Sequence, residues 1–182
     1  KTTGADWEWW FIFPNFSYKF RVQAKKTKTT SNNYRGMTYP NKTSTQMGKL
    51  ISDAYSNNAI PIYAYYTNKI DRVKCNKKIL DEGVYLISAI DLKNKFVVPK
   101  ITKIDYNDIL EDTIPLSCLL CCELQKNPHN NNPDNFERFI KEYFNQDESN
   151  VSQDSASIGK HSKTPYYVES LLEFSNKNLP DY

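Results

Sequence analysis

Two β-prone runs in the first 25 residues constrain the fold of this chain more than any other feature. Residues 6–13 and 18–25 are rich in aromatic and β-branched side chains, and the sequence Pro-Asn-Phe-Ser at 14–17 separates them. Strand-forming runs joined by a short segment with turn-forming residues predict an antiparallel β-hairpin. Along the second run, apolar residues at even positions alternate with polar residues at odd positions, which is typical of a strand with one buried face and one polar face.

The hairpin carries its polar residues in pairs. Asp6 and Glu8 are two positions apart on the first run, and Gln23 and Lys25 are two apart on the second. Side chains two apart in a strand project from the same face, so a short hairpin would bring the pairs side by side. Metal-assisted phosphodiester hydrolysis requires a carboxylate, further oxygen ligands and a nearby lysine. In this interpretation Asp6 holds Mg²⁺ (or Mn²⁺), Gln23 supplies an amide oxygen, and Lys25 lies near the attacking water.

A structural interpretation of the same residues stays open, because an alternating strand commonly has a solvated face. The aromatic neighbours of Asp6 favour the functional one, since a charge without a role would be costly in those surroundings. The lysines at 25, 26 and 28 are open to two interpretations as well. Such a run is commonly a solvated face, but Lys26 and Lys28 are also candidates for contacts with a phosphate backbone.

The length and charge of the chain set broad limits. Its 182 residues fit one domain of ordinary size better than two. The net charge of +3 is too small to indicate nucleic-acid binding by itself.

The cysteines and the hydropathy pattern bear on the compartment. Three of the four cysteines lie in the apolar run 115–122. Buried free thiols in a reducing compartment are the simplest explanation, and we expect a cytoplasmic protein. Half a zinc site or a redox pair at Cys118 and Cys121 is the alternative, although no second Cys or His pair has matching spacing. No apolar run is long enough for a membrane helix and no signal peptide is visible, so we expect no membrane association.

Further elements follow the hairpin in an order typical of an α/β domain. The first are a polar loop at 26–43, a helix capped by Ser44 or Thr45 that runs to about Asn57, a strand at 60–66, and a run at 84–90 that fits a strand or a strand-to-helix junction. The later ones are a helix near 114–125 after acidic residues at 105–112, a helix at 135–144, a mobile Ser- and Asp-rich loop at about 147–163, and a last helix at 166–175.

Several strings of residues carry a resemblance to known families. Gly4-Ala5-Asp6, a hairpin, and then Val22-Gln23-Ala24-Lys25 are similar to the Asp and (Glu/Gln)-x-Lys elements of the PD-(D/E)XK nuclease superfamily. Over most of its length, the chain more narrowly resembles a family of unknown function, DUF6615. The strings that carry this second resemblance are Thr3–Trp10, Arg21–Lys26, Gln46 with Leu50, Pro61–Tyr63, Ile87–Ala89, Pro115–Cys118 and Leu179–Tyr182.

The superfamily resemblance implies a restriction-endonuclease-like α/β fold with a mixed four-stranded sheet flanked by helices. It also implies that Mg²⁺ is bound at Asp6 and Gln23, that Lys25 is the catalytic lysine, and that Gln46 on the next helix is an auxiliary polar residue. Glu8 is a second auxiliary candidate, because its carboxylate would compensate for the neutral amide at position 23.

The resemblance also divides the chain into two parts. We expect residues 1–126 to form the nuclease-like core and residues 127–182 to form a helical extension packed on it. Superfamily members usually carry an acidic residue on a helix that precedes the first strand. Residues 1–5 contain no such helix, so we expect it upstream of them.

Three hypotheses from different functional classes follow. The first is a Mg²⁺-dependent nuclease that acts in defence against foreign nucleic acid, with DNA favoured over RNA. The second is a nucleic-acid-binding module of the same fold without catalysis, in which lysines and exposed aromatic residues contact backbone and bases. The third is a protein-interaction subunit or homodimer that uses exposed aromatic residues and the acidic segment 105–112.

Overall fold

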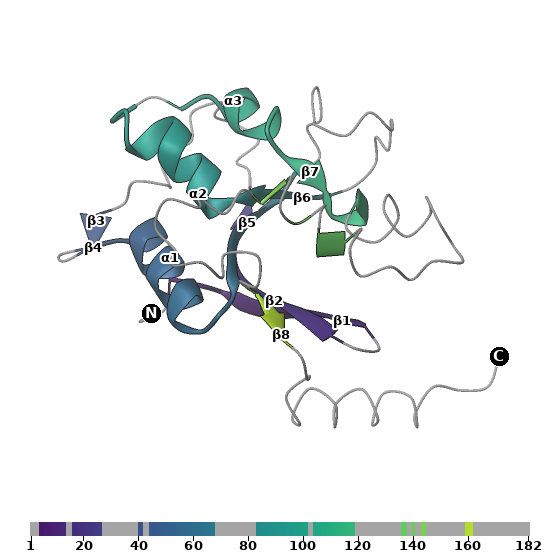
Figure 1. Ribbon diagram of the computed structural model, residues 1–182. Coiled ribbons are helices and arrows are strands. Elements are labelled where there is room, and N and C mark those ends of the chain that lie inside the picture. The colour runs from purple at the N-terminus through teal and green to yellow at the C-terminus, as the bar shows by residue number, and fades with distance from the viewer. Residues whose placement is uncertain are drawn as a thin grey trace.

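The computed structural model describes about half of the chain. The described residues are 4–13, 16–26, 40–41, 44–67, 83–101, 104–118, 136–137, 140, 143–144 and 159–161. They form an α/β structure built on one mixed sheet (Figure 1). None of the helices in these ranges is long and apolar enough to span a membrane.

The sheet has the strand order β1-β2-β5-β6-β7, and β8 pairs with the start of β2. The bounds are β1 Trp7–Phe13, β2 Phe16–Lys26, β5 Ile60–Tyr66, β6 Val84–Ser88, β7 Ile114–Pro115 and β8 Lys160–His161. The strand β2 is antiparallel to β1 and parallel to β5, and the pairs β5–β6 and β6–β7 are antiparallel. A separate antiparallel pair consists of β3 (Pro40–Asn41) and β4 (Ser44–Thr45). The sheet is therefore mixed, with β2 between an antiparallel and a parallel neighbour.

One long helix connects the two parallel strands. The helix α1 (Gln46–Ser56) is capped by Thr45, whose side chain accepts a hydrogen bond of 3.0 Å from the backbone N–H of Gly48. Such a cap satisfies one of the free N–H groups of the first helical turn. The buried residues of α1 are Met47, Leu50, Ile51 and Ala54. Their spacing places one apolar stripe against the sheet.

Shorter helical segments follow β6. They are α2 (Ala89–Leu92), the π-helical turn η1 (Lys93–Val97) and α3 (Tyr106–Leu110). Figure 1 shows α1 and α2 on the same side of the sheet. Side chains from α1, α2, η1 and α3 share one hydrophobic cluster with Tyr63, Tyr65, Tyr85 and Ile87 of β5 and β6.

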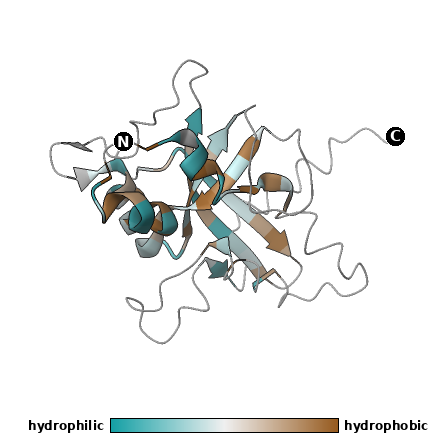
Figure 2. Cartoon of the chain, turned by 90° about the horizontal axis from the view of Figure 1, so that it is seen from above, coloured by the Kyte–Doolittle hydropathy of each residue, from teal (hydrophilic) through white to brown (hydrophobic). Residues whose placement is uncertain are grey.

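The second face of the sheet has its own core. Residues of β2 and β5 that point to this face, among them Phe20, Val22, Ile60 and Ile62, pack with residues from later in the chain. The later residues are Ile114, Cys118, Phe136, Ile140 and Phe144. In Figure 2 hydrophobic residues lie both in the strands and on the helices, as expected for a sheet that packs against helices.

The sequence predictions for the first half of the core are confirmed in outline. The hairpin, the helix capped by Thr45 and the strand at 60–66 are present, and the sheet is mixed. The hairpin turn is tighter than expected, because Phe16 pairs with Phe13 and belongs to β2. The run at 84–90 is a strand-to-helix junction, where the Ser88 hydroxyl accepts a hydrogen bond of 3.1 Å from the N–H of Ile90.

The later elements depart from prediction in two places. The helix expected from Ile114 begins too early, because Ile114 and Pro115 pair with β6 as strand β7. A proline is tolerated at the edge of a sheet, where its missing N–H is not needed. The sheet has two short strands beyond the four expected, and one of them, β8, lies inside the segment expected to be a mobile loop.

The division at residue 126 stays a prediction. Within 135–144, Phe136, Ile140 and Phe144 are buried against the sheet at helical spacing, and the N–H of Phe144 donates to the carbonyl of Ile140 at 2.9 Å. The last predicted helix, at 166–175, lies outside the described residues.

A glycine sets the distance between the start of the chain and α1. Gly4 is buried with a φ of +72°, a conformation that favours glycine. A Cβ at this position would lie 2.6 Å from the carbonyl oxygen of Gln46 and 2.7 Å from the backbone nitrogen of Leu50. Only a residue without a side chain allows residues 4–6 to pass this close to the first turn of α1.

We expect Gly4→Ala to lower the free energy of unfolding by about 2 kcal/mol or more, because the methyl group adds a backbone clash to an unfavourable φ. Urea denaturation followed by circular dichroism measures the change. The matched control is Gly83→Ala, where an added Cβ has no atom within 4 Å. A Gly4→Ala protein as stable as the Gly83→Ala protein would contradict the close approach.

Candidate functional site

Four of the sequence-predicted site residues lie in one chain of hydrogen bonds. The Lys25 Nζ donates to Gln46 Oε1 at 2.8 Å, and Gln46 Nε2 donates to Gln23 Oε1 at 2.5 Å. The Nε2 of Gln23 in turn donates to Asp6 Oδ2. We call this set, Lys25, Gln46, Gln23 and Asp6, the polar chain.

The fold brings these residues together from three segments. Asp6 directly precedes β1, and its backbone N–H donates to the carbonyl of Val22 at 2.8 Å. Gln23 and Lys25 project from the same face of β2. Gln46 is the first residue of α1, which crosses that face. The hairpin register and the cap of α1 therefore place the polar chain at one end of β2.

The oxygen atoms around Gln23 are the kind that Mg²⁺ prefers. Asp6 Oδ2 accepts a hydrogen bond of 3.1 Å from the backbone N–H of Ala24. The carbonyl of Ala24 accepts a second hydrogen bond, of 3.1 Å, from Gln23 Nε2. A carboxylate oxygen and a backbone carbonyl oxygen thus lie around one end of the Gln23 amide. Both are hard ligands suited to Mg²⁺ or Mn²⁺.

The charge available to a cation here is small. Within the described parts of the chain, no group of three or more His, Cys, Asp or Glu side chains is arranged to hold a metal ion. Asp6 is the one carboxylate of the polar chain. Mg²⁺ commonly uses one or two protein carboxylates and keeps several waters, so this donor set fits the ion in kind. Asp6, Gln23 and the carbonyl of Ala24 are the groups that would hold it.

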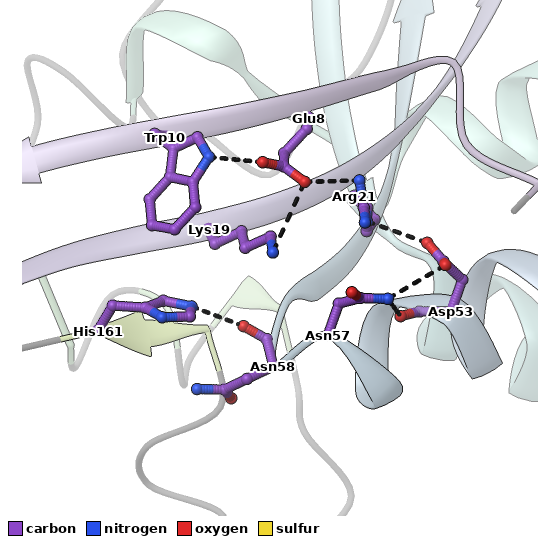
Figure 3. A network of polar contacts seen from close by, with 8 residues as sticks. All are labelled: Glu8, Trp10, Lys19, Arg21, Asp53, Asn57, Asn58 and His161. Carbon is purple, nitrogen blue, oxygen red and sulfur yellow. Dashed lines mark hydrogen bonds and ion pairs between the residues drawn. The ribbon is translucent and has the colours of Figure 1, made fainter. Parts of the chain in front are cut away.

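Glu8, predicted as an auxiliary residue, belongs to a second network further along the hairpin (Figure 3). Its Oε2 lies 2.6 Å from Arg21 Nη1 and 3.6 Å from Lys19 Nζ, and its Oε1 accepts a hydrogen bond of 2.7 Å from Trp10 Nε1. Arg21 Nε is also 3.0 Å from Asp53 Oδ2 on α1, without alignment for a hydrogen bond. Ion pairs thus offset the charge of Glu8.

The two lysines predicted to contact nucleic acid differ in what the structure shows. Lys26 is exposed at the end of β2. Lys28 lies outside the described residues.

One buried aromatic residue, Tyr63, lies beside the polar chain. Lys25 Nζ is 6.0 Å from the ring centre of Tyr63, which is the partner of Gln23 on β5 and is fully buried. The Tyr63 hydroxyl has no hydrogen-bond partner within the described residues. Burial raises the pKa of the Tyr63 hydroxyl above its ordinary value.

The acidic segment 105–112 is largely engaged within the chain. The carboxylate of Asp105 caps α3 through the N–H of Asn107 at 2.8 Å. Lys95 Nζ pairs with Glu111 at 2.7 Å and Asp112 at 2.5 Å. Burial lowers the pKa of Lys95, but these hydrogen bonds outweigh it, and the net shift is upward. Intramolecular partners thus reduce the charge that the segment would offer to a protein partner.

Comparison with known proteins identifies the family. The model of the family of unknown function DUF6615 matches residues 1–181. The chain belongs to this family. No curated protein and no solved structure matches it significantly. The narrower of the two sequence resemblances is therefore confirmed, and membership in DUF6615 assigns no activity.

Sequence reasoning found the polar chain of this DUF6615 member but missed Arg21, Lys19 and Asp53 as a network. Arg21 and Lys19 could have been predicted, because both lie on the polar face of β2 with Gln23 and Lys25. The signal for Asp53 was its position seven residues after Gln46, which places both on the same side of α1. The carbonyl of Ala24 had no sequence signal, since every residue has one.

We expect Arg21→Met to lower the free energy of unfolding by about 1–2 kcal/mol, because it leaves two partly buried carboxylates without their shared cation. Chemical denaturation checks the value. The triple variant with Glu8→Gln and Asp53→Asn removes both charges as well and should recover part of the loss. A triple variant less stable than Arg21→Met would contradict this account of the network.

We expect Tyr63→Phe to make the protein less sensitive to alkali. The raised pKa means that the folded state holds its phenol proton above pH 10.0, the ordinary pKa, where the unfolded state releases it. Stability is thus unaffected by this group below that pH and falls as pH rises above it. Thermal unfolding between pH 8 and about 11 should show a shallower decline in Tyr63→Phe than in the control Tyr66→Phe, at the exposed end of β5. Equal declines in the two variants would show that Tyr63 does not contribute to the loss of stability at alkaline pH.

Proposed function

We propose that this chain is a Mg²⁺-dependent nuclease with a restriction-endonuclease-like fold, which hydrolyses phosphodiester bonds of foreign nucleic acid in the cytoplasm, with DNA favoured over RNA. The observation that carries the proposal is the polar chain. A carboxylate, two amides and a lysine from three separate segments meet at one end of β2. Polar residues on a solvated strand face need no such partners from other segments of the chain.

Three members of the polar chain act on the ion or the phosphate in this proposal. When bound, the divalent ion supplies charge stabilisation on the phosphate and lowers the pKa of a water molecule. Asp6 and Gln23 hold the ion. Lys25 places a positive charge beside the reacting phosphate, where charge develops. Lys26, which is exposed at the end of β2, and Lys28 are the candidates for contacts with the phosphate backbone.

The strand arrangement supports the fold part of the proposal. A hairpin, a helix and a strand parallel to the second hairpin strand produce a mixed sheet with a helix against it. The superfamily resemblance implies this kind of core. The side chains of the polar chain lie on the face of β2 that α1 covers, so the helix both completes the fold and supplies Gln46.

A second candidate is a nucleic-acid-binding module without catalysis. Two observations favour it. Asp6 is the one carboxylate of the polar chain, and the oxygen of Gln23 is engaged by Gln46. Trp7, next to Asp6, is 55% exposed and is thus available to stack on a base.

Cleavage of labelled single- and double-stranded DNA and RNA tests the proposal, with Mg²⁺ or Mn²⁺ compared with EDTA. We expect metal-dependent cutting that falls at least a hundredfold in Asp6→Asn and in Lys25→Met, because each removes a charge from the site. Lys93→Met, which removes an exposed positive charge from η1, is the control for net charge. Its activity should equal that of the wild type.

Two results would count against the nuclease. Cutting that survives in Asp6→Asn and Lys25→Met would place the activity elsewhere or in a contaminant. No cutting of any substrate, together with binding that weakens as salt rises, would favour the binding module.

A further inference from the structure

The polar chain has a fixed direction. A lysine ammonium group donates hydrogen bonds and accepts none, whereas an ionised carboxylate accepts and does not donate. Lys25 stands at one end of the chain and Asp6 at the other, with two amides between them. Each amide has a donor end and an acceptor end. Gln46 must therefore turn its oxygen toward Lys25, and Gln23 must turn its oxygen toward Gln46.

The same direction is fixed independently at the Asp6 end. The Gln23 nitrogen donates to Asp6 Oδ2 and also to the carbonyl of Ala24, at 3.1 Å. Rotating the Gln23 amide by half a turn would place its oxygen against both of these oxygens. The partial negative charges of these three oxygen atoms repel one another unless a cation lies between them.

A divalent cation at Asp6 would reverse this preference. With the cation in place, the oxygen of Gln23 would face Asp6 and the carbonyl of Ala24, and its nitrogen would face Gln46. Two donor groups would then meet between Gln23 and Gln46, so the Gln46 amide must also turn. Its nitrogen then faces the Lys25 ammonium group, which has no acceptor left on Gln46.

We propose that Gln46 is a positioning residue that couples cation binding at Asp6 and Gln23 to release of the Lys25 ammonium group. This inference rests on the proposed function and deepens it. Without the cation, Gln46 holds Lys25 by a hydrogen bond of 2.8 Å. With the cation, Lys25 leaves Gln46 and is available to the phosphodiester. The site thus presents its lysine to substrate only after the cation is bound.

Linkage makes the proposal measurable without substrate. If the cation displaces Lys25 from Gln46, then the Lys25–Gln46 hydrogen bond must oppose cation binding to the same extent. Lys25→Met should therefore raise cation affinity for two reasons. It removes a like charge, and it frees Gln46 to turn. Gln46→Leu breaks the polar chain, so in that background Lys25→Met retains only the charge effect.

The experiment is a double-mutant cycle of Lys25→Met and Gln46→Leu. Affinity for Mn²⁺ alone is measured from the loss of the free-ion EPR signal, and thermal unfolding confirms that each variant folds. We expect Lys25→Met to tighten Mn²⁺ binding about tenfold more in the wild-type background than in the Gln46→Leu background, the scale of one hydrogen bond to a charged group. Asp6→Asn, the site control, should abolish the binding.

A spectroscopic readout separates coupling from a structural role of Gln46. In a Mg²⁺ titration of the wild type followed by NMR, the side-chain amide signals of Gln23 and Gln46 should shift with one midpoint. A shift at Gln23 alone would overturn the proposal.

The outcomes of the cycle are distinguishable. Mn²⁺ binding that needs Asp6, with additive effects of the two substitutions, would overturn the coupling and leave the cation site of the proposed function standing. No Mn²⁺ binding to the wild type or to any variant would overturn both.

Discussion

The contact between α1 and the polar face of β2 positions both polar networks of the described chain. The helix runs back along the strand, since Gln46 at its start meets Gln23 and Lys25, and Asp53 two turns later meets Arg21. From Arg21 to the middle of Gln23 and Lys25 is three residues of strand, about 10 Å, and from Gln46 to Asp53 is seven residues of helix, also about 10 Å. The two pairs of contacts are therefore equally spaced on the helix and on the strand. Gly4 permits the close approach of the preceding segment to the helix start.

Polar groups line this contact at both ends. Between these ends, α1 also packs on the tyrosines of β5 and the following segments in an apolar cluster. A buried polar group is costly unless it is hydrogen-bonded, and Gln23 is 3% exposed. Its donors and its acceptor all have partners. The Glu8 and Arg21 network provides ion pairs at the other end. A register shift of β1 or α1 would leave several of these groups unpaired, which makes the polar contacts a source of specificity in the packing.

Much of the fold and of the candidate site could be predicted from the sequence, because local patterns carried the information. The alternation of apolar and polar residues predicted the two faces of β2, and the capping residue Thr45 predicted the start of α1. The polar pairs at 6 and 8 and at 23 and 25 indicated the polar side of the hairpin. Spacing could not show that Asp6 and Glu8 belong to different networks. That outcome depends on which residues α1 brings across β2. Likewise, β7 and β8 are two residues long, and their pairing comes from tertiary contacts rather than from propensity.

Direct observation of a cation tests the central claim that Asp6 and Gln23 form a metal site. Crystals grown with Mn²⁺ and measured for anomalous scattering would locate the ion without assumptions about activity. We expect a peak within about 2.3 Å of an Asp6 carboxylate oxygen and of the Gln23 amide oxygen, with Lys25 no longer bonded to Gln46. A fully folded crystal structure at saturating Mn²⁺ with no peak at Asp6, and with the polar chain intact, would contradict it.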